Sequence, residues 1–161
     1  MTDKHTLHAY HAARDAAAYT DLPGWGWLRL TGRDRLDLLH RLSTNAVKNL
    51  APGAGAPTVL TNAGGRVMAV VTVYAGEGEA FLRTAAEQSA GVPRYLNSMI
   101  FWQDQVEVAN LSAERAQFAL YGPEAQAALE RLTGEELSAV AEYGWRNATL
   151  GGERVSLHRG G

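Results

Sequence analysis

Three histidines near the N-terminus are the residues whose type and spacing most directly suggest chemistry. His5, His8 and His11 follow one another at three-residue intervals, and imidazole is a common zinc ligand. On a helix, however, such steps fan the side chains over roughly 120° instead of converging them on one ion. The chain also contains no cysteine, which excludes thiolate metal sites, disulfides and a cysteine nucleophile within it. We therefore expect no metal site.

The paired glycines Gly64-Gly65 could belong to a loop that cradles a phosphate. Such loops end in Lys-Ser/Thr and open a helix, and neither feature follows here. Asn62-Ala63-Gly64-Gly65 instead lies between two β-rich runs, which predicts a hairpin turn. The second run, residues 67–73, is apolar on both faces, whereas an antiparallel strand usually alternates. Either a protein core or a ligand must cover its second face.

The tryptophans and serines are the remaining side chains that could bind or react with a ligand. An indole ring can stack on a heterocycle, but large aromatic side chains more often fill a core or an interface. No Gly-x-Ser-x-Gly nucleophile motif occurs in the sequence. The tryptophans are Trp25, Trp27, Trp102 and Trp145.

Composition limits the partners of the chain. A formal charge of −2 and a pI near 6.2 argue against nucleic acid or an anionic membrane as the main partner, because both require clustered basic residues. No apolar run approaches the roughly 20 residues of a membrane span, and the polar start lacks the apolar core of a signal peptide. We expect a soluble cytoplasmic protein whose 161 residues form one domain.

The elements that must position these residues alternate between strands and helices. Helices are expected at 7–19, from residue 34 with Leu36, Leu39 and Leu42 on one face, at 89–102 and at 124–132. Strands are expected at 25–30, in the hairpin at 59–74, at 80–84, at 106–109, at 117–120, and in a last hairpin at 145–159.

The order of these elements suggests an internal repeat. Leu30-Thr31-Gly32-Arg33-Asp34 and Leu120-Tyr121-Gly122-Pro123-Glu124 both place a glycine and an acidic residue between a strand and a helix. We expect an α+β fold of two pseudo-repeated β-α-β units with mixed or antiparallel sheets. The first repeat would cover about 22–105 and the second about 106–161. The second repeat ends on a strand, so we expect it to be incomplete and the chain to be an N-terminal portion of a longer protein.

Three polar residues have simple structural interpretations. Asp34 stands where it could accept backbone N–H bonds at a helix start. Asn45, after Thr44, suits a left-handed turn at the end of that helix. Arg14, close to His11, could pair with a carboxylate such as Asp21.

Several of these spacings together resemble one family, the folate-binding domain of the glycine cleavage T-protein and its YgfZ-like relatives. No single element is decisive, but their order matches over nearly the whole chain. The matching residues are His11, Arg14, Asp21, Leu30-Thr31-Gly32-Arg33-Asp34, Leu39, Ser43-Thr44-Asn45, Gly53, Asn62-Ala63-Gly64-Gly65, Val73-Tyr74 and Leu120-Tyr121-Gly122-Pro123-Glu124-Ala125.

The resemblance implies a tetrahydrofolate pocket between the two repeats, which would cover the second face of the 67–73 strand. The implied folate-binding residues are Val67, Met68, Ala69, Val70 and Thr84. A family aspartate that assists one-carbon transfer falls on Ala69, which cannot accept a proton. A family tyrosine and asparagine fall on Pro57 and Ala85. The resemblance therefore implies folate binding without a catalytic residue.

Three functions remain open at this point. Loss of the aspartate is typical of YgfZ-like proteins, which bind folate and support iron–sulfur cluster enzymes, although their Lys-Gly-Cys motif is absent here. The first alternative is an aminomethyltransferase that transfers a one-carbon unit with other groups. The second is a truncated structural module without a ligand, whose unpaired strand edge at 155–159 would favour self-association.

Overall fold

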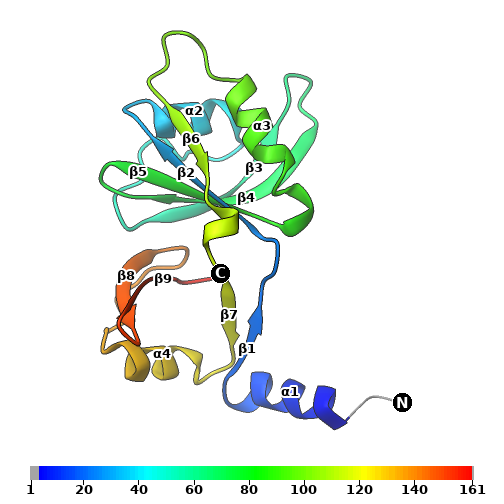
Figure 1. Cartoon of the computed structure of the whole chain (residues 1–161), viewed down its shortest axis with the longest axis vertical. Helices are drawn as coiled ribbons and strands as arrows, with labels where there is room; N and C mark the ends of the chain where they lie inside the picture. The colour runs from blue at the N-terminus through cyan, green and yellow to red at the C-terminus, as the bar shows by residue number, and fades with distance from the viewer. Residues whose placement is uncertain (1–3, 161) are drawn as a thin grey trace.

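The computed structural model describes residues 4–160 and arranges them in two halves, one above the other in Figure 1. The upper half is a five-stranded antiparallel sheet in the order β3-β4-β5-β2-β6, with two helices. Its strands are β2 (Gly26–Thr31), β3 (Gly55–Thr61), β4 (Val67–Ala75), β5 (Glu79–Thr84) and β6 (Glu107–Asn110), and its helices are α2 (Arg35–Leu42) and α3 (Gly91–Ser98).

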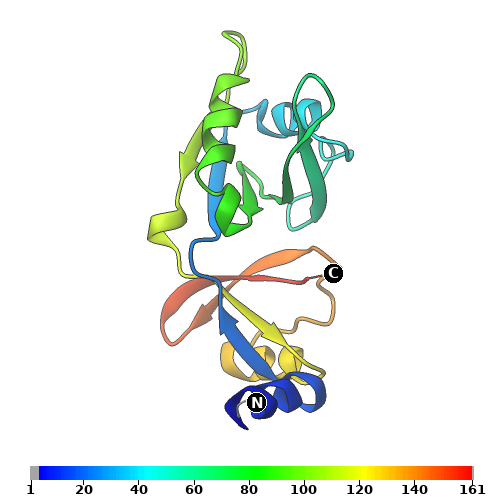
Figure 2. The ribbon, with the colours of Figure 1, turned by 90° about the vertical axis from the view of Figure 1, so that its right-hand side faces the viewer.

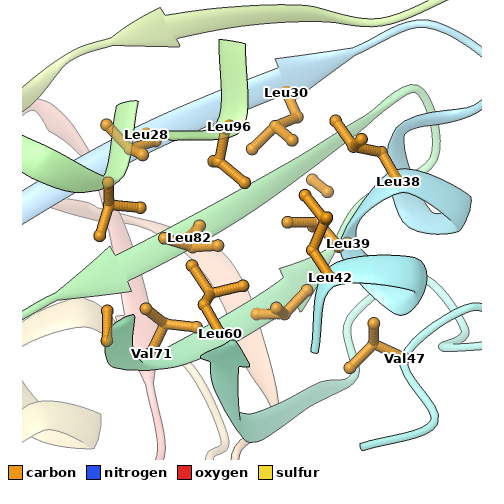
Figure 3. Packing of buried hydrophobic residues seen from close by; sticks show 14 residues of the cluster. Leu28, Leu30, Leu38, Leu39, Leu42, Val47, Leu60, Val71, Leu82 and Leu96 are labelled. Carbon is orange, nitrogen blue, oxygen red and sulfur yellow. The ribbon is translucent and has the colours of Figure 1, made fainter. Parts of the chain in front are cut away.

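One face of this sheet carries the hydrophobic core. The leucines of α2 lie at i, i+1 and i+4, so they form one apolar stripe that can cover a sheet. Strands β2, β4 and β5 contribute alternate residues to the same core, as expected for a strand with one face toward the interior. Figure 3 shows the resulting cluster, which includes Leu28, Leu30, Leu38, Leu39, Leu42, Leu60, Val71, Leu82 and Leu96.

The lower half contains two separate two-stranded sheets. One pairs β1 (Ala18–Asp21) with β7 (Phe118–Tyr121), and the other pairs β8 (Trp145–Leu150) with β9 (Glu153–His158). Helices α1 (Lys4–Asp15) and α4 (Ala125–Thr133) lie at the far end of this half (Figures 1 and 2). The N-terminal strand β1 thus belongs with the C-terminal part of the chain.

Two segments connect the halves: one leads from β1 to β2, and the other leads from β6 to β7. Hydrogen bonds join these two segments to each other. The backbone N–H of Leu22 donates to Gln117 O (2.9 Å), and the Gln117 side chain donates to Trp25 O (3.0 Å). The chain also contains two short 3-10 helices, Ala86–Gln88 and Ser112–Glu114.

The α+β class with antiparallel sheets is as the sequence predicts, and so are most elements. Two assignments differ. The strand near 106–109, expected to open the second repeat, is β6 and pairs with β2 in the first sheet. The short strand β1 was not expected at all, because a four-residue run with three exposed residues carries almost no hydrophobic period.

The three polar residues also behave differently from their predicted roles. Asp34 makes no side-chain cap to α2; its carboxylate accepts the N–H of Gln105 (2.9 Å) at the approach to β6. Asn45 has no positive φ, and its amide donates to Pro57 O on β3 (2.5 Å). Each residue bonds to a distant segment that a local pattern does not reveal.

Arg14 does not reach Asp21. Its guanidinium pairs with the neighbouring Asp15 carboxylate through two contacts of 2.7 Å. The His11 ring lies 3.9 Å from the same carboxylate, while Asp21 lies on β1 opposite Phe118.

No helix within residues 4–160 is long and apolar enough to cross a bilayer.

Gly32 and Gly122 are required by the same geometry in the two halves. Their φ angles are +94° and +109°, and a Cβ at either site would collide with a backbone carbonyl, that of Gln105 and that of Ala16 respectively. A side chain would therefore suffer both a left-handed backbone and a steric clash.

We expect Gly32→Ala to lower the free energy of unfolding by about 2 kcal/mol or more, because strain and clash add. Gly91→Ala is the matched control, since its Cβ would meet nothing within 4 Å and alanine favours a helix. Urea denaturation of both variants measures the difference; equal stabilities would contradict the steric account.

Candidate functional site

Strand β4 divides its apolar side chains between two faces of the sheet. Ala69 and Val73 are fully buried in the core beneath α2 and α3. Val70, between them, is 60% exposed, and Met68 beside the β-bulge is 44% exposed. The second apolar face of β4 is therefore not covered by the same core.

One end of that second face is covered by the β8–β9 hairpin of the lower half. Trp27, Tyr74 and Phe81 form a second buried cluster, against which Trp145 of β8 packs. The Trp145 indole donates to Ala75 O (2.8 Å). This cluster joins the two halves of the molecule.

His158, the last residue of β9, sits inside this aromatic cluster. Its ring lies 4.3 Å from the ring of Tyr74, 5.0 Å from that of Trp27, and stacks on Trp145 at 5.8 Å. Burial, together with the nearby Arg83 charge, lowers the pKa of His158 to about 4. The imidazole is therefore neutral near pH 7, and it packs as an aromatic ring.

The remainder of the second face is open, and we call it the open face. Thr72 and Arg83 are cross-strand partners there, as are Val59 and Val70. The open face consists of Val59, Met68, Val70, Thr72 and Arg83.

Arg83 closes one side of the open face. Its guanidinium lies 4.2 Å from the centre of the Trp25 ring, a cation–π contact that holds the charge in place. Among the described residues, no carboxylate lies within ion-pair distance of it. An exposed apolar surface beside a guanidinium that has no carboxylate partner among the described residues suits a planar heterocycle that carries an anionic group.

The predicted folate residues fall on different sides of the sheet. Ala69 and Thr84 are 0% and 1% exposed and point into the core, so neither side chain lines an open surface. Val67, Met68 and Val70 are exposed. Ala69 thus faces the core while its neighbours Met68 and Val70 belong to the open face, because side chains alternate along a strand.

A cleft of about 580 Å³ lies between the β4–β5 turn and β8, away from residues 67–70. Its walls include Thr31, Glu79, Trp145 and Asn147. Arg146 at its rim is already paired with Glu135 (2.6 Å). Sequence reasoning did not identify this cleft, because its walls come from four distant segments.

Most of the motif residues lie in turns, in the aromatic cluster or in backbone hydrogen bonds between segments. Gly65 adopts a φ of +73° in the β3–β4 turn, where the Asn62 side chain accepts the N–H groups of Gly64 and Arg66. Tyr74 is buried in the aromatic cluster. Thr44 donates its N–H to Val59 O (3.1 Å). Pro123 is an exposed residue before α4.

Metal ligands do not gather in the part of the chain with described side chains. Among those residues, no group of three or more histidine or acidic side chains could hold a metal ion. The side chain of His5 lies outside them.

We expect Ala69→Asp to lower the free energy of unfolding by about 3 kcal/mol or more, because it places a carboxyl group in an apolar core. Val70→Asp is the control on the same strand and should cost less than about 1 kcal/mol, since its side chain faces solvent. Chemical denaturation at pH 7 compares them. Similar losses would show that both faces of β4 are equally buried.

Stability should fall in acid through His158. A pKa of about 4 in the folded state, against about 6.5 unfolded, means that the unfolded chain binds more protons between these values. The contribution is complete above pH 6.5 and is lost as the pH falls toward 4, by about 2 kcal/mol at pH 5. His158→Phe keeps an aromatic ring and should remove this part of the pH dependence, which urea titrations at pH 7 and pH 5 would reveal.

The chain is similar in sequence to several proteins named aminomethyltransferases. An aminomethyltransferase of Synechococcus sp. is 31% identical over 153 residues, and one of Geobacillus kaustophilus is 29% identical over 154 residues. Each match covers 94% of this chain and 42% of the relative. A putative chloroplastic transferase of Arabidopsis thaliana is 26% identical over 124 residues, 77% of this chain and 29% of that protein. The chain thus spans less than half the length of these relatives.

Solved structures show the same fold. Aminomethyltransferase T of the glycine cleavage system of Bartonella henselae superposes with a TM-score of 0.71 and 19% identity, over 78% of this chain and 34% of that one. The heterotetrameric sarcosine oxidase of Corynebacterium sp. U-96 gives 0.66 and 18%, over 100% and 82%. The family model described as the GCVT N-terminal domain matches residues 2–161. The chain therefore belongs to the GCVT N-terminal domain family.

Proposed function

We propose that this domain binds a reduced folate, tetrahydrofolate or a one-carbon derivative of it, on the open face. The observation that carries the proposal is the exposure of Val70 and Met68 on β4, an internal strand of the sheet. Solvent contact of that kind is costly for apolar side chains and is typical of a surface that something else covers. Relatives named aminomethyltransferases support a folate as the occupant.

The chemistry of the open face favours binding over catalysis. A pterin ring could lie on Met68 and Val70, and the Arg83 guanidinium could meet a folate carboxylate as a charge-assisted hydrogen bond. The strand carries no ionisable side chain from Val67 to Val73. The family aspartate could be matched to Met68 or Val70 instead of Ala69. Even so, neither face of this strand would carry a side chain that accepts a proton.

This lack of an acid favours the narrower role of a YgfZ-like factor that supports iron–sulfur enzymes. The alternative is an aminomethyltransferase whose acid–base groups come from other segments, and the named relatives favour it. Formation of methylenetetrahydrofolate that depends on a lipoyl carrier would establish the alternative. The third function, a structural module without a ligand, requires the open face to stay uncovered. A cytoplasmic location stays a prediction.

Isothermal titration with tetrahydrofolate tests the proposal in the protein that carries this domain. We expect saturable binding that Val70→Glu weakens at least about tenfold, because the new carboxylate displaces the ring and repels the folate carboxylates. Trp102→Glu is the matched control: Trp102 is 95% exposed on the loop after α3, so the same chemical change there should leave the affinity unaltered. Absence of binding at millimolar ligand would reject the proposal.

A further inference from the structure

Arg83 on β5 is a half-buried cation without a counter-charge in the described part of the chain. Among residues 7–160, no carboxylate lies within ion-pair distance of its guanidinium. Arg14, Arg41 and Arg146, by contrast, each have a carboxylate oxygen at 2.7 Å or less. A guanidinium that is partly removed from water normally has an anionic partner. The pairing of Arg83 is therefore incomplete within these residues.

The ionisable side chains around Arg83 do not offset its charge. Burial raises the pKa of Tyr74, although the Arg83 charge opposes this rise. Burial lowers the pKa of His158, and the Arg83 charge lowers it further. Near pH 7 both neighbours are therefore neutral, a phenol and an uncharged imidazole, and the positive charge of Arg83 stays available to an anion from outside.

The register of the sheet brings Trp25 to Arg83. Trp27 lies directly opposite Arg83 in the β2–β5 ladder, and Gly26 lies opposite Thr84. Because alternate residues of a strand share a face, Trp25 lies on the same face as Trp27 and diagonally across from Arg83. Diagonal neighbours are within reach of aromatic and long side chains, which explains why the guanidinium lies over the Trp25 ring at 4.2 Å.

Trp25 is itself fixed by contacts with other segments. Its backbone N–H donates to Leu22 O (3.4 Å), and its carbonyl accepts the side-chain amide of Gln117 (3.0 Å). The Gln117 carbonyl in turn accepts the N–H of Leu22 (2.9 Å). The indole ring thus belongs to the two joined segments that connect the halves, and it offers Arg83 a fixed support.

The surroundings of the guanidinium favour a carboxylate as its partner. A guanidinium presents a fork of N–H donors that matches the two oxygens of a carboxylate. Trp25 and Trp27 shield one side of it from water, and shielding strengthens an electrostatic contact. Thr72, its cross-strand partner on β4, belongs to the open face, so an anion at Arg83 lies beside a ring bound there.

We propose that Trp25 is a positioning residue for Arg83, and that the pair makes the open face select heterocycles that carry a carboxylate over neutral ones of the same shape. The ring holds the guanidinium in place, so less side-chain freedom is lost when an anion binds. This inference rests on the proposed folate site and narrows its ligands to folates with free glutamate carboxylates. Trp25 acts through Arg83 and does not touch the ligand.

Calorimetric titration of the protein that carries this domain with two ligands isolates the contribution of charge. The ligands are tetrahydrofolate and its diamide, in which both glutamate carboxylates are converted to neutral amides of nearly the same shape. We expect tetrahydrofolate to bind at least about tenfold more tightly than the diamide at low ionic strength, and the ratio of the affinities to fall as salt is added. Equal affinities would overturn the inference and leave the proposed folate site intact.

Variants separate the roles of Trp25 and Arg83. Arg83→Gln should reduce the affinity ratio to about one, because glutamine carries no charge. Trp25→Leu should reduce it at least about threefold, and Trp25→Phe should restore most of it, since phenylalanine keeps an aromatic face. Adding Trp25→Leu to Arg83→Gln should change the ratio no further. A general loss of stability does not alter a ratio of two affinities, so a ratio that Trp25→Leu leaves unchanged would overturn the positioning role.

Arg94→Gln is the matched control. Arg94 is exposed on α3, a helix that packs on the core face of the sheet through Val92 and Leu96. The same chemical change there removes a positive charge from the opposite side of the sheet and should leave the affinity ratio unaltered. An equal fall of the ratio in Arg94→Gln and Arg83→Gln would assign the selectivity to overall charge, and would contradict a site at Arg83.

A second readout does not require the whole folate. p-Aminobenzoylglutamate carries the two glutamate carboxylates without the pterin, and the Nε–Hε NMR signal of Arg83 reports an anion at the guanidinium. We expect this compound to shift the signal in the wild type, and to shift it about half as much or less in Trp25→Leu at the same concentration. That result without any binding of tetrahydrofolate would reject the proposed function and retain the anion site. An Arg83 signal that neither compound perturbs would overturn the inference.

Discussion

The period of two along β4 is the constraint on which the rest of the structure depends. Alternate side chains of a strand point to opposite faces, so Ala69 and Val73 enter the core below α2 and α3 while Val70 faces away from it. A strand in the middle of a sheet cannot shift by one residue without exchanging these two sets. Both the core and the open face follow from this single choice of register.

The second face of the sheet is covered at one end by the β8–β9 hairpin of the same chain and is open to solvent at the other. His158 and Trp145 bring β8 and β9 onto one end of it, and the neutral imidazole behaves there as one more aromatic ring. Since a charged imidazole loses the favourable hydration that it has in water, the contact between the halves depends on the absence of a proton. The other end of the face keeps the Arg83 charge, which in turn disfavours protonation of His158.

Much of the fold could be predicted from the sequence, because hydrophobic period and glycine turns are local properties. The α2 leucines, the Asn62–Gly65 turn and the repeated strand–glycine–helix pattern each specify their element without help from distant residues. The roles of Asp34 and Asn45 could not be predicted, because their partners, Gln105 and Pro57, are brought to them by the tertiary fold. The assignment of β6 failed for the same reason: strand pairing is decided by β2, a neighbour in space.

The candidate site combines a strand that the sequence singled out with residues that it did not. The sequence identified the strand at 67–73 as the one whose second face needs an occupant, yet it could not tell which residues share that face. The β-bulge beside Met68 shifts the pairing between Leu60 and Thr61, and such irregularities have no clear sequence signal. Ala69, chosen by its position in a motif, therefore lies in the core, and Arg83, which no motif contained, borders the open face.

Exposed apolar side chains lie in both halves of this molecule, and their surroundings bear on function. Val70 is exposed on β4, an internal strand of the upper sheet, and the cross-strand pair Thr72 and Arg83 lies on the same face. Leu132 is exposed on α4, a helix that buries none of its residues. The exposure of Leu132 therefore reflects how one helix packs. The exposure of Val70 belongs to a surface that combines apolar side chains with a positive charge, and this combination favours recognition of an anionic heterocycle.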